Sequence, residues 1–138
     1  MKLIKFFLLC MLTISFGHNA SAQKNDKIKV LIIDGQNNHD NWPRTTPMMK
    51  GYLEETGLFV VDIATTPPAD ASMEGFKPDF SKYKVVLLNY NGKDWPKETN
   101  DAFEAFVSGG GGVVSVHAAD NAFPEWLAYN KMIGIGGW

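Results

Sequence analysis

The sequence predicts an α/β fold with a doubly wound parallel sheet, and three observations lead to this class. Short apolar runs rich in β-branched residues recur along the 138-residue chain, as expected for strands buried on both faces. Stretches with apolar residues at helical spacing separate most of these runs. Proline and glycine stand where those stretches begin and end. Strands that alternate with helices build a parallel sheet covered by helices, and the length suits one small domain.

The first half of the domain reads as strand, loop, helix and strand. Residues 29–34 form an apolar run that ends before a glycine, and they predict the first strand. After a polar loop, Pro43 can begin a helix, since the first helical turn needs no N–H from that residue, and Gly57 can end it. Residues 58–64 predict a second strand. Residues 65–80 contain three prolines and predict a long surface loop.

The second half continues this alternation. Residues 84–90 predict the third strand, and residues 96–108 predict a helix with one apolar stripe that the following glycines stop. Residues 112–117 predict the fourth strand, and Pro124 begins a last helical stretch. The core segments of three strands are expected to run parallel in one sheet: residues 30–34, 85–89 and 113–117. The loops after these strands should then lie at the same edge of the sheet.

The two ends of the chain predict a signal peptide and an incomplete domain, respectively. Two lysines precede an apolar run at residues 6–16, and Ala20-Ser21-Ala22 fits a cleavage site, so residues 1–22 are expected to be a signal peptide. We therefore expect export to the periplasm or the medium and a mature domain of residues 23–138. The apolar run is shorter than the roughly 20 residues that cross a bilayer, which predicts no membrane span. Residues 134–138 resemble a turn that enters further structure, so the domain is expected to be incomplete at its carboxyl end.

Composition excludes several classes of function. Of the 13 basic residues, Lys2 and Lys5 belong to the expected signal peptide, so the mature chain has 11 basic and 15 acidic residues and a net charge near −4. A nucleic-acid binder needs a basic face, and the sequence predicts none. The one cysteine, Cys10, also lies in the expected signal peptide. Disulfides, cysteine-ligated zinc and a cysteine nucleophile are therefore not expected in the mature protein.

Two histidines are the main candidates for chemistry. His39 follows the first strand by five residues, and His117 ends the fourth. Open parallel sheets bind ligands beyond the carboxyl ends of their strands, so both side chains are expected to converge on one crevice. Together with a carboxylate such as Asp120, two imidazoles could ligate a divalent metal such as zinc. Alternatively, His117 could act in acid–base catalysis with Asp120, or the histidines could be structural: His117 a core residue and His39 a solvated one.

Aromatic and amide side chains in the same loops are typical of a sugar site. Trp42, Trp95 and Asn91 could stack on a sugar ring and bond its hydroxyl groups, although loop tryptophans are also common as half-buried anchors. The glycine run at residues 109–112 closes a helix and leads into a strand, which is the wrong order for a phosphate-binding loop. Ser115 lacks the glycines of a nucleophile elbow.

Three segments carry a family resemblance: VLIIDGQNNHDNWPRTTPMMKGYLEETGLFVVDI, YKVVLLNYNG and, most specifically, GGGGVVSVHAADNAF. Over residues 27–138 the sequence resembles the ThuA-like (trehalose utilisation) family. The resemblance implies a flavodoxin-like three-layer sandwich similar to class I glutamine amidotransferases. His117 then stands where those enzymes have their catalytic cysteine, and glutamine hydrolysis through a thioester is excluded because the mature chain has no cysteine.

The resemblance also implies a role in the metabolism of trehalose or related glycosides, including their keto forms. It carries over His39 and His117 as site residues, followed by Asp120 and Asn91. Our leading hypothesis is an exported, sugar-active hydrolase or isomerase in which the histidines bind a metal or move protons. A non-catalytic carbohydrate-binding or accessory module is the alternative, and an inactive fragment is another. A small-molecule sugar is the only partner that the sequence indicates.

Overall fold

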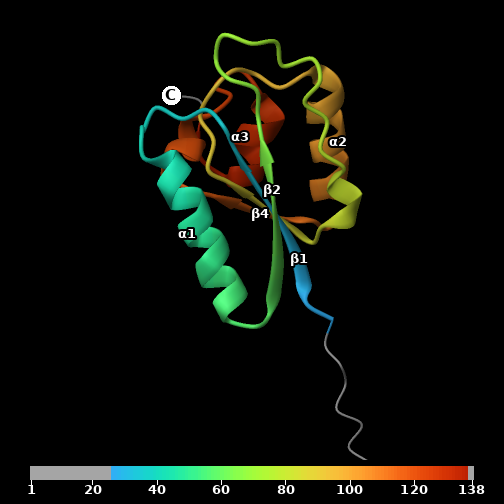
Figure 1. The fold of residues 1–138 in the computed structure, drawn as a ribbon. Coiled ribbons are helices and arrows are strands. Elements are labelled where there is room, and N and C mark those ends of the chain that lie inside the picture. Colours follow the sequence, from blue (N-terminus) through green and yellow to red (C-terminus); the bar gives the residue numbers. More distant parts are fainter. Residues whose placement is uncertain (1–25, 137–138) are drawn as a thin grey trace, which may run out of the picture.

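The computed structural model describes residues 26–136 and has the expected α/β architecture, with helices on both faces of a sheet (Figure 1). The predicted signal peptide, residues 1–22, and its cleavage site lie outside the described residues, as do Gln23 and the last two residues of the chain. Within residues 26–136, no helix has both the length and the apolar character needed to cross a membrane.

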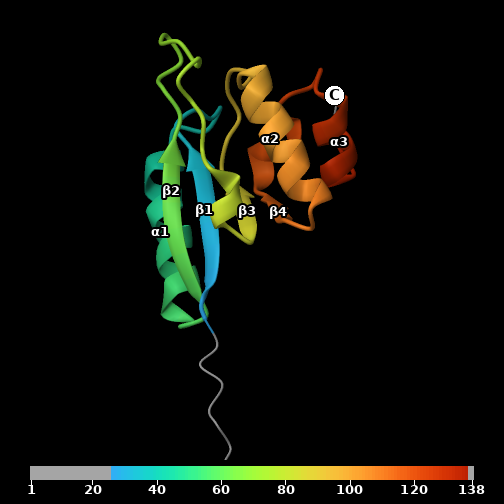
Figure 2. The ribbon, with the colours of Figure 1, turned by 90° about the vertical axis from the view of Figure 1, so that its right-hand side faces the viewer.

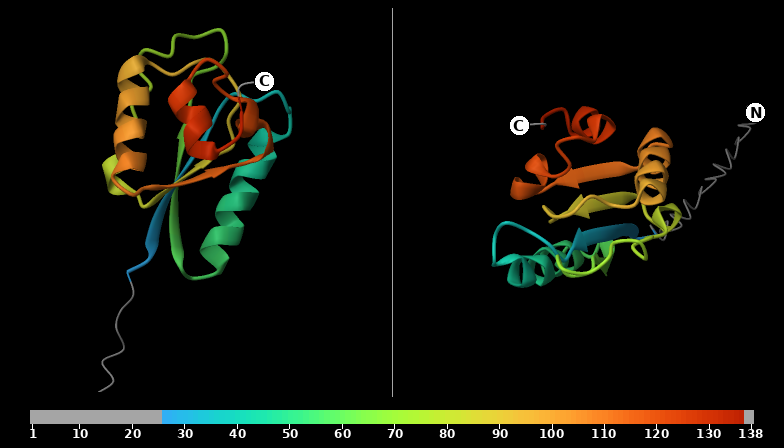
Figure 3. Two further views of the ribbon diagram at one scale, coloured as in Figure 1. Left: turned by 180° about the vertical axis from the view of Figure 1, so that it is seen from behind. Right: turned by 90° about the horizontal axis from the view of Figure 1, so that it is seen from above.

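The sheet has four strands, and every neighbouring pair is parallel. In chain order the strands are β1 (Ile28–Asp34), β2 (Phe59–Thr65), β3 (Val85–Leu88) and β4 (Gly112–Ser115). Their spatial order is β2-β1-β3-β4, which confirms the prediction of parallel strands in one sheet. The arrows of β1, β3 and β4 point to one edge, where the loop after β1 and the turn after β4 lie (Figure 3).

Two strands end earlier than predicted. The pairing of β3 with β4 stops at Leu88 and Ser115, so Asn89 and His117 lie beyond the strands. The N–H of Val116 still donates to the carbonyl oxygen of Leu88 (3.0 Å). His117, however, has a φ of +50°, which is incompatible with a strand, and it begins the short 3₁₀ helix η2 (His117–Asn121). The last residue of the predicted fourth strand, His117, therefore belongs to a turn.

Helices cover the two faces unequally. They are α1 (Trp42–Glu55), α2 (Lys97–Ser108) and α3 (Leu127–Ile133). α1 covers one face, and α2 and α3 cover the other (Figure 2). Because strand side chains alternate between faces, Val30 and Ile32 pack with α1, whereas Leu31 and Ile33 pack in the larger core with α2 and α3. The doubly wound arrangement is thus confirmed.

The segment between β2 and β3 is more deeply packed than a surface loop. Met73, Phe76 and Phe80 are buried in the larger core, and Phe80 begins the 3₁₀ helix η1 (Phe80–Lys82). Thr99 of α2 donates from Oγ1 to the carbonyl oxygen of Phe76 (2.6 Å). These contacts hold the segment against α2.

The last helix begins three residues later than predicted. Pro124 follows Phe123, whose φ is +55°, and the N–H of Trp126 donates to the carbonyl oxygen of Phe123 (3.0 Å). This bond closes a turn over residues 123–126, so α3 starts only at Leu127.

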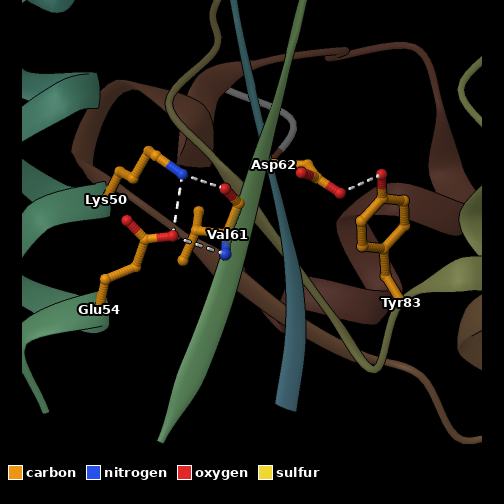
Figure 4. Close-up of polar contacts among 5 residues, drawn as sticks. All are labelled: Lys50, Glu54, Val61, Asp62 and Tyr83. Carbon is orange, nitrogen blue, oxygen red and sulfur yellow. Dashed lines mark hydrogen bonds and ion pairs between the residues drawn. The ribbon is translucent and has the colours of Figure 1, made fainter. Parts of the chain in front are cut away.

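Two side chains of α1 bind the outward backbone groups of Val61 on the edge strand β2 (Figure 4). The N–H of Val61 donates to Oε1 of Glu54 (3.2 Å), and the ammonium group of Lys50 donates to the carbonyl oxygen of Val61. Lys50 and Glu54 also form an ion pair with each other (2.9 Å). Unpaired backbone groups on an edge strand can bind another strand, so this cap disfavours strand addition at the middle of β2.

Candidate functional site

His39 and His117 lie side by side at the carboxyl edge of the sheet. Their ring centroids are 4.7 Å apart, the ring planes are inclined by 31°, and both residues are exposed. The prediction that these two imidazoles converge is therefore confirmed. The roles of the two rings as metal ligands or catalysts remain predictions.

Backbone geometry at the end of β4 places His117 at this edge. Val116 is extended and continues the ladder, and the positive φ of His117 then turns the chain sharply into η2. A residue with a side chain is uncommon in the left-handed region, and such strain is found preferentially at functional sites. The turn brings the imidazole beyond the strand, where it meets the loop that follows β1.

Hydrogen bonds of the Asn37 side chain position His39. Asn37 accepts a hydrogen bond from the N–H of His39 at its Oδ1 (2.9 Å), which makes a tight Asx turn. The amide nitrogen of Asn37 reaches the carbonyl oxygen of Asn89 at the end of β3 (3.4 Å). The loop that carries His39 is thereby tied to the centre of the sheet.

Asn89 is the polar residue at the base of the site. It is 6% exposed, and its Nδ2 donates to the hydroxyl oxygens of Thr45 and Thr46 in the first turn of α1 (3.0 Å each). The sequence does not single out these threonines. The signal that could have found them is an asparagine directly after a buried apolar strand, because a buried amide needs partners.

A groove of about 390 Å³ runs from the histidine pair along the space between α1 and the end of β4. Polar side chains line one end of it: Asn37, His39, Asn41, Thr45, Asn89 and His117. Apolar residues line most of the rest: Met48, Met49, Val116 and Ala118, beside Tyr52. Among these described lining residues there is no aspartate, glutamate, lysine or arginine. The groove is therefore suited to a neutral ligand.

Asp120 is not part of the groove lining that His39 and His117 share. It is half-buried in η2 and is not among the residues that line the groove. Its negative charge acts on Tyr129 of α3, where burial raises the pKa of the phenol to about 12 and Asp120 adds to the rise. Asp120 stands three residues after His117 within η2, but it does not contribute to the groove lining.

Besides the two imidazoles, the groove lining offers few donors for a metal ion. Catalytic zinc usually takes three protein ligands, and the groove offers the two imidazoles and neutral amides. Within residues 26–136, no group of three or more histidine, cysteine, aspartate or glutamate side chains could hold a metal ion. The described residues therefore do not complete the predicted zinc site.

Trp95 is a core residue, which corrects its assignment to substrate binding. It is 3% exposed and contacts a cluster of aromatic rings: Phe76, Phe80, Tyr90, Phe103, Phe123 and Trp126. Burying a large indole ring in an aromatic cluster is favourable, so the loop after β3 folds inward over the larger core. A substrate at the sheet edge has no access to this ring.

Trp42 and Asn91 remain near the edge, on the far side of Asn37. Both line a second, shallower depression of about 350 Å³. The amide nitrogen of Asn91 donates to the carbonyl oxygen of Ala118 (2.9 Å), which fixes η2 beside the third strand. Asn91 thus supports the turn that carries His117, and Trp42 is the tryptophan that is partly accessible here.

Comparisons with known proteins agree with this fold. The family model of ThuA, described as trehalose utilisation, matches residues 29–137. The crystal structure of a ThuA-like protein from Parabacteroides merdae ATCC 43184 is similar with a TM-score of 0.78 and 48% sequence identity, over 82% of this chain and 40% of that one. No curated protein has significant sequence similarity to this chain.

A ThuA-like protein from Bacteroides uniformis ATCC 8492 shares 24% identity with a TM-score of 0.57, over 83% of this chain and 46% of that one, and supports the fold alone. The chain spans less than half the length of either solved relative. With a family match over most of its length and a relative at 48% identity, the chain belongs to the ThuA family, whose description is trehalose utilisation.

Proposed function

We propose that the chain acts on a neutral sugar of trehalose or related-glycoside metabolism, and that His39 and His117 transfer protons in the isomerisation of its keto form. The observation that carries this proposal is the imidazole pair, with ring centroids 4.7 Å apart, at the polar end of the groove. Membership of the trehalose utilisation family supports the class of substrate. The signal-like residues 1–22 support a site of action outside the cytoplasm.

Two neighbouring imidazoles suit proton transfer on a keto sugar. A neutral imidazole accepts a proton at one ring nitrogen while it carries a proton on the other. One ring can therefore take a proton from the carbon beside the carbonyl group, and the other can give a proton to the carbonyl oxygen. Return of a proton to the former carbonyl carbon of the enediol, with loss of the neighbouring hydroxyl proton, completes the isomerisation.

Glycoside hydrolysis has less support from this geometry. Most glycoside hydrolases flank the scissile bond with two carboxyl groups, one as acid and one as nucleophile or base. The groove-lining residues that the structure describes include no carboxylate. Isomerisation, which needs proton transfer alone, therefore fits the site better than hydrolysis.

Deuterium exchange tests the proposal directly. The full chain is incubated with the keto form of trehalose in D₂O, and deuterium incorporation beside the carbonyl group is followed by NMR. His39→Ala and His117→Ala should each slow exchange by about 10²- to 10⁴-fold. Thermal unfolding should change little, because both side chains are exposed. Asn38→Ala is the matched control, since Asn38 is an exposed residue of the same loop outside the groove lining, and it should exchange like the wild type.

Two results would overturn the assignment of proton transfer to the imidazoles. Exchange that is equally fast in both alanine variants would remove the histidines from the chemistry. Exchange that requires added zinc and stops with a chelator would make the reaction metal-assisted.

A carbohydrate-binding role without catalysis is the second candidate. The depression lined by Trp42 and Asn91 favours this role. It presents a partly accessible indole beside amide groups, and neither histidine lines it. In that case the wild-type chain should catalyse no exchange. Sugar binding measured by calorimetry should survive His117→Ala and be lost in Trp42→Ala.

A further inference from the structure

The histidine pair joins two segments that are not neighbours in the sheet. His39 belongs to the loop that follows β1, whereas His117 begins η2 after β4, and β3 lies between these two strands. The ring centroids are 4.7 Å apart although both residues are exposed, so burial does not hold the rings together. The residues that follow β3 are placed to connect the two segments.

Asn91, three residues after the end of β3, forms hydrogen bonds to both segments. Its N–H donates to the carbonyl oxygen of Gln36, in the loop that carries His39 (3.0 Å). Its Nδ2 donates to the carbonyl oxygen of Ala118, the residue after His117 (2.9 Å). One residue thus links the backbones of the two histidine segments.

Asn91 belongs to a tightly packed loop. Gln36 is 6% exposed, and its Oε1 accepts a hydrogen bond from the N–H of Lys93 in the same loop (2.9 Å). The Nε2 of Gln36 donates to the carbonyl oxygen of Pro67, so the loops after β1, β2 and β3 meet at one buried amide (2.7 Å). A side-chain carbon at Gly92 would overlap Gln36, because the two loops approach each other so closely. The backbone of Asn91 is therefore fixed relative to β1.

The bond from Asn91 to Ala118 acts beside a strained residue. His117 has a φ of +50°, and the carbonyl group that accepts the bond follows one residue later. Strained backbone persists where the surrounding structure holds it. From the side of α3, the hydroxyl group of Tyr129 donates to the next carbonyl oxygen, that of Ala119 (2.7 Å). Tyr129 thus holds η2 to the core, and Asn91 holds it to the loop of the other histidine.

Resting on the proposed function, we propose that Asn91 is a positioning residue for proton transfer: its amide holds His117 at the separation from His39 that the reaction requires. Asn91 is not among the groove-lining residues, so it acts through the imidazole and not on the substrate in the groove. A misplacement of about 1 Å can cost a reaction about 100-fold in rate. Loss of this bond should therefore lower turnover and leave the affinity of the groove for substrate unchanged.

An isosteric substitution tests this role. Asn91→Asp keeps the shape of the side chain but places a carboxylate oxygen opposite the carbonyl oxygen of Ala118, where two acceptors repel each other. Deuterium exchange of the keto form of trehalose is measured with the full chain over a range of substrate concentrations. The variant should have a kcat about 10- to 100-fold lower and an unchanged KM. Asn91→Ala removes the donor without adding charge and should lower kcat in the same way.

A spectroscopic readout and a matched control separate positioning from general destabilisation. The ring protons of His39 and His117 should give a nuclear Overhauser effect in the wild type, and this effect should weaken in both Asn91 variants. Asn130→Asp is the control, because Nδ2 of Asn130 also donates to a backbone carbonyl oxygen, that of Pro124 (3.1 Å). Asn130 lies on α3, which covers the other face of the sheet (Figure 2). Its variant should lose thermal stability but keep the Overhauser effect and wild-type exchange.

A double variant identifies the residue through which Asn91 acts. His117→Ala removes the ring that the bond positions, so adding Asn91→Asp to it should slow exchange no further. Additive losses would overturn the proposal, because Asn91 would then act independently of His117. A wild-type kcat with an unchanged Overhauser effect in Asn91→Asp would overturn it too. So would a raised KM with an unchanged kcat, which would make Asn91 a substrate-binding residue.

Failure of the proposed function gives a different result. If the wild type catalyses no exchange, or if His39→Ala and His117→Ala exchange as fast as the wild type, proton transfer by the imidazoles is excluded and the role of Asn91 in it is excluded as well. If the histidine variants lose exchange and Asn91→Asp does not, the proposed function stands and only the positioning role is overturned.

Discussion

At the scale of single residues, the site depends on unusual backbone at one position and unusual polarity at another. His117 has a left-handed conformation that side chains adopt at a cost, and Asn89 has a buried amide at the end of an apolar strand. Each brings a polar group to the carboxyl edge of the sheet, where the groove begins.

The conformation of His117 leads to a prediction about stability. Glycine adopts a φ of +50° without the strain that a side chain brings, so His117→Gly should be more stable than His117→Ala by up to about 1 kcal/mol. Urea unfolding of the two variants measures the difference. Both should lack exchange activity. An alanine variant more stable than the glycine variant would show that the wild-type chain does not hold this residue in the left-handed region.

The buried amide of Asn89 leads to a second prediction. Asn89→Ala leaves the hydroxyl group of Thr46, which is 1% exposed, without its partner and should lower the free energy of unfolding by about 1–3 kcal/mol. It also removes Oδ1 of Asn89, one of the two acceptors of the Asn37 amide, whereas the backbone carbonyl oxygen at this position remains. Urea unfolding should detect the loss, and Asn38→Ala should show none. A variant as stable as the wild type would contradict the role of this residue as a support.

At the scale of elements, α1 both covers the sheet and caps its edge. Lys50 and Glu54 satisfy the outward backbone groups of Val61, as Figure 4 shows, and further along β2 the hydroxyl group of Tyr83 donates to Asp62 (3.0 Å). Side chains from α1 and from the segment before β3 thus both bond to the edge strand β2.

The cap on β2 should depend on pH. Hydrogen bonds from Lys50 and from the N–H of Val61 hold the pKa of Glu54 below its ordinary value of 4.5. Because the folded-state pKa is depressed, this contribution to stability is present above pH 4.5 and is lost as the pH falls through the lower folded value. Glu54→Gln should flatten that part of the acid profile in urea unfolding. Glu55→Gln, an exposed neighbour, is the control, and an unchanged profile in Glu54→Gln would contradict the cap.

The elements could largely be predicted, because apolar periodicity identifies strands and helices and a parallel sheet gathers its strand ends at one edge. That topology sufficed to bring His39 and His117 together. It could not show that Asp120 stays outside the groove lining, because His117 begins a 3₁₀ helix and does not end the strand. Nor could it show that Trp95 is buried, because the path of a loop is decided by tertiary packing, here against an aromatic cluster.

At the scale of the whole molecule, the chain combines a packed core on one face of the sheet with an open groove on the other. The larger core holds most of the buried aromatic rings, whereas the α1 side holds a smaller cluster and leaves β4 partly uncovered. The proposed site is therefore on the less densely covered face.

Export remains a prediction at this scale. If residues 1–22 are a signal peptide, amino-terminal sequencing of the protein recovered from the periplasm or medium should begin at Gln23. Replacing Ala20 and Ala22 by bulky residues should block processing, because the cleavage site requires small side chains. A cytoplasmic product that retains Met1 would contradict export.

The burial of Trp95 has a consequence for spectroscopy. Its indole ring contacts Phe103, Phe123 and Trp126 in a fixed environment, so the folded chain should give a strong near-ultraviolet circular dichroism signal and blue-shifted emission that unfolding abolishes. The residues that line the histidine groove include no tryptophan. A ligand in that groove should therefore leave the circular dichroism and emission signals of Trp95 nearly unchanged. Spectroscopy can then follow folding while calorimetry on the same sample measures binding.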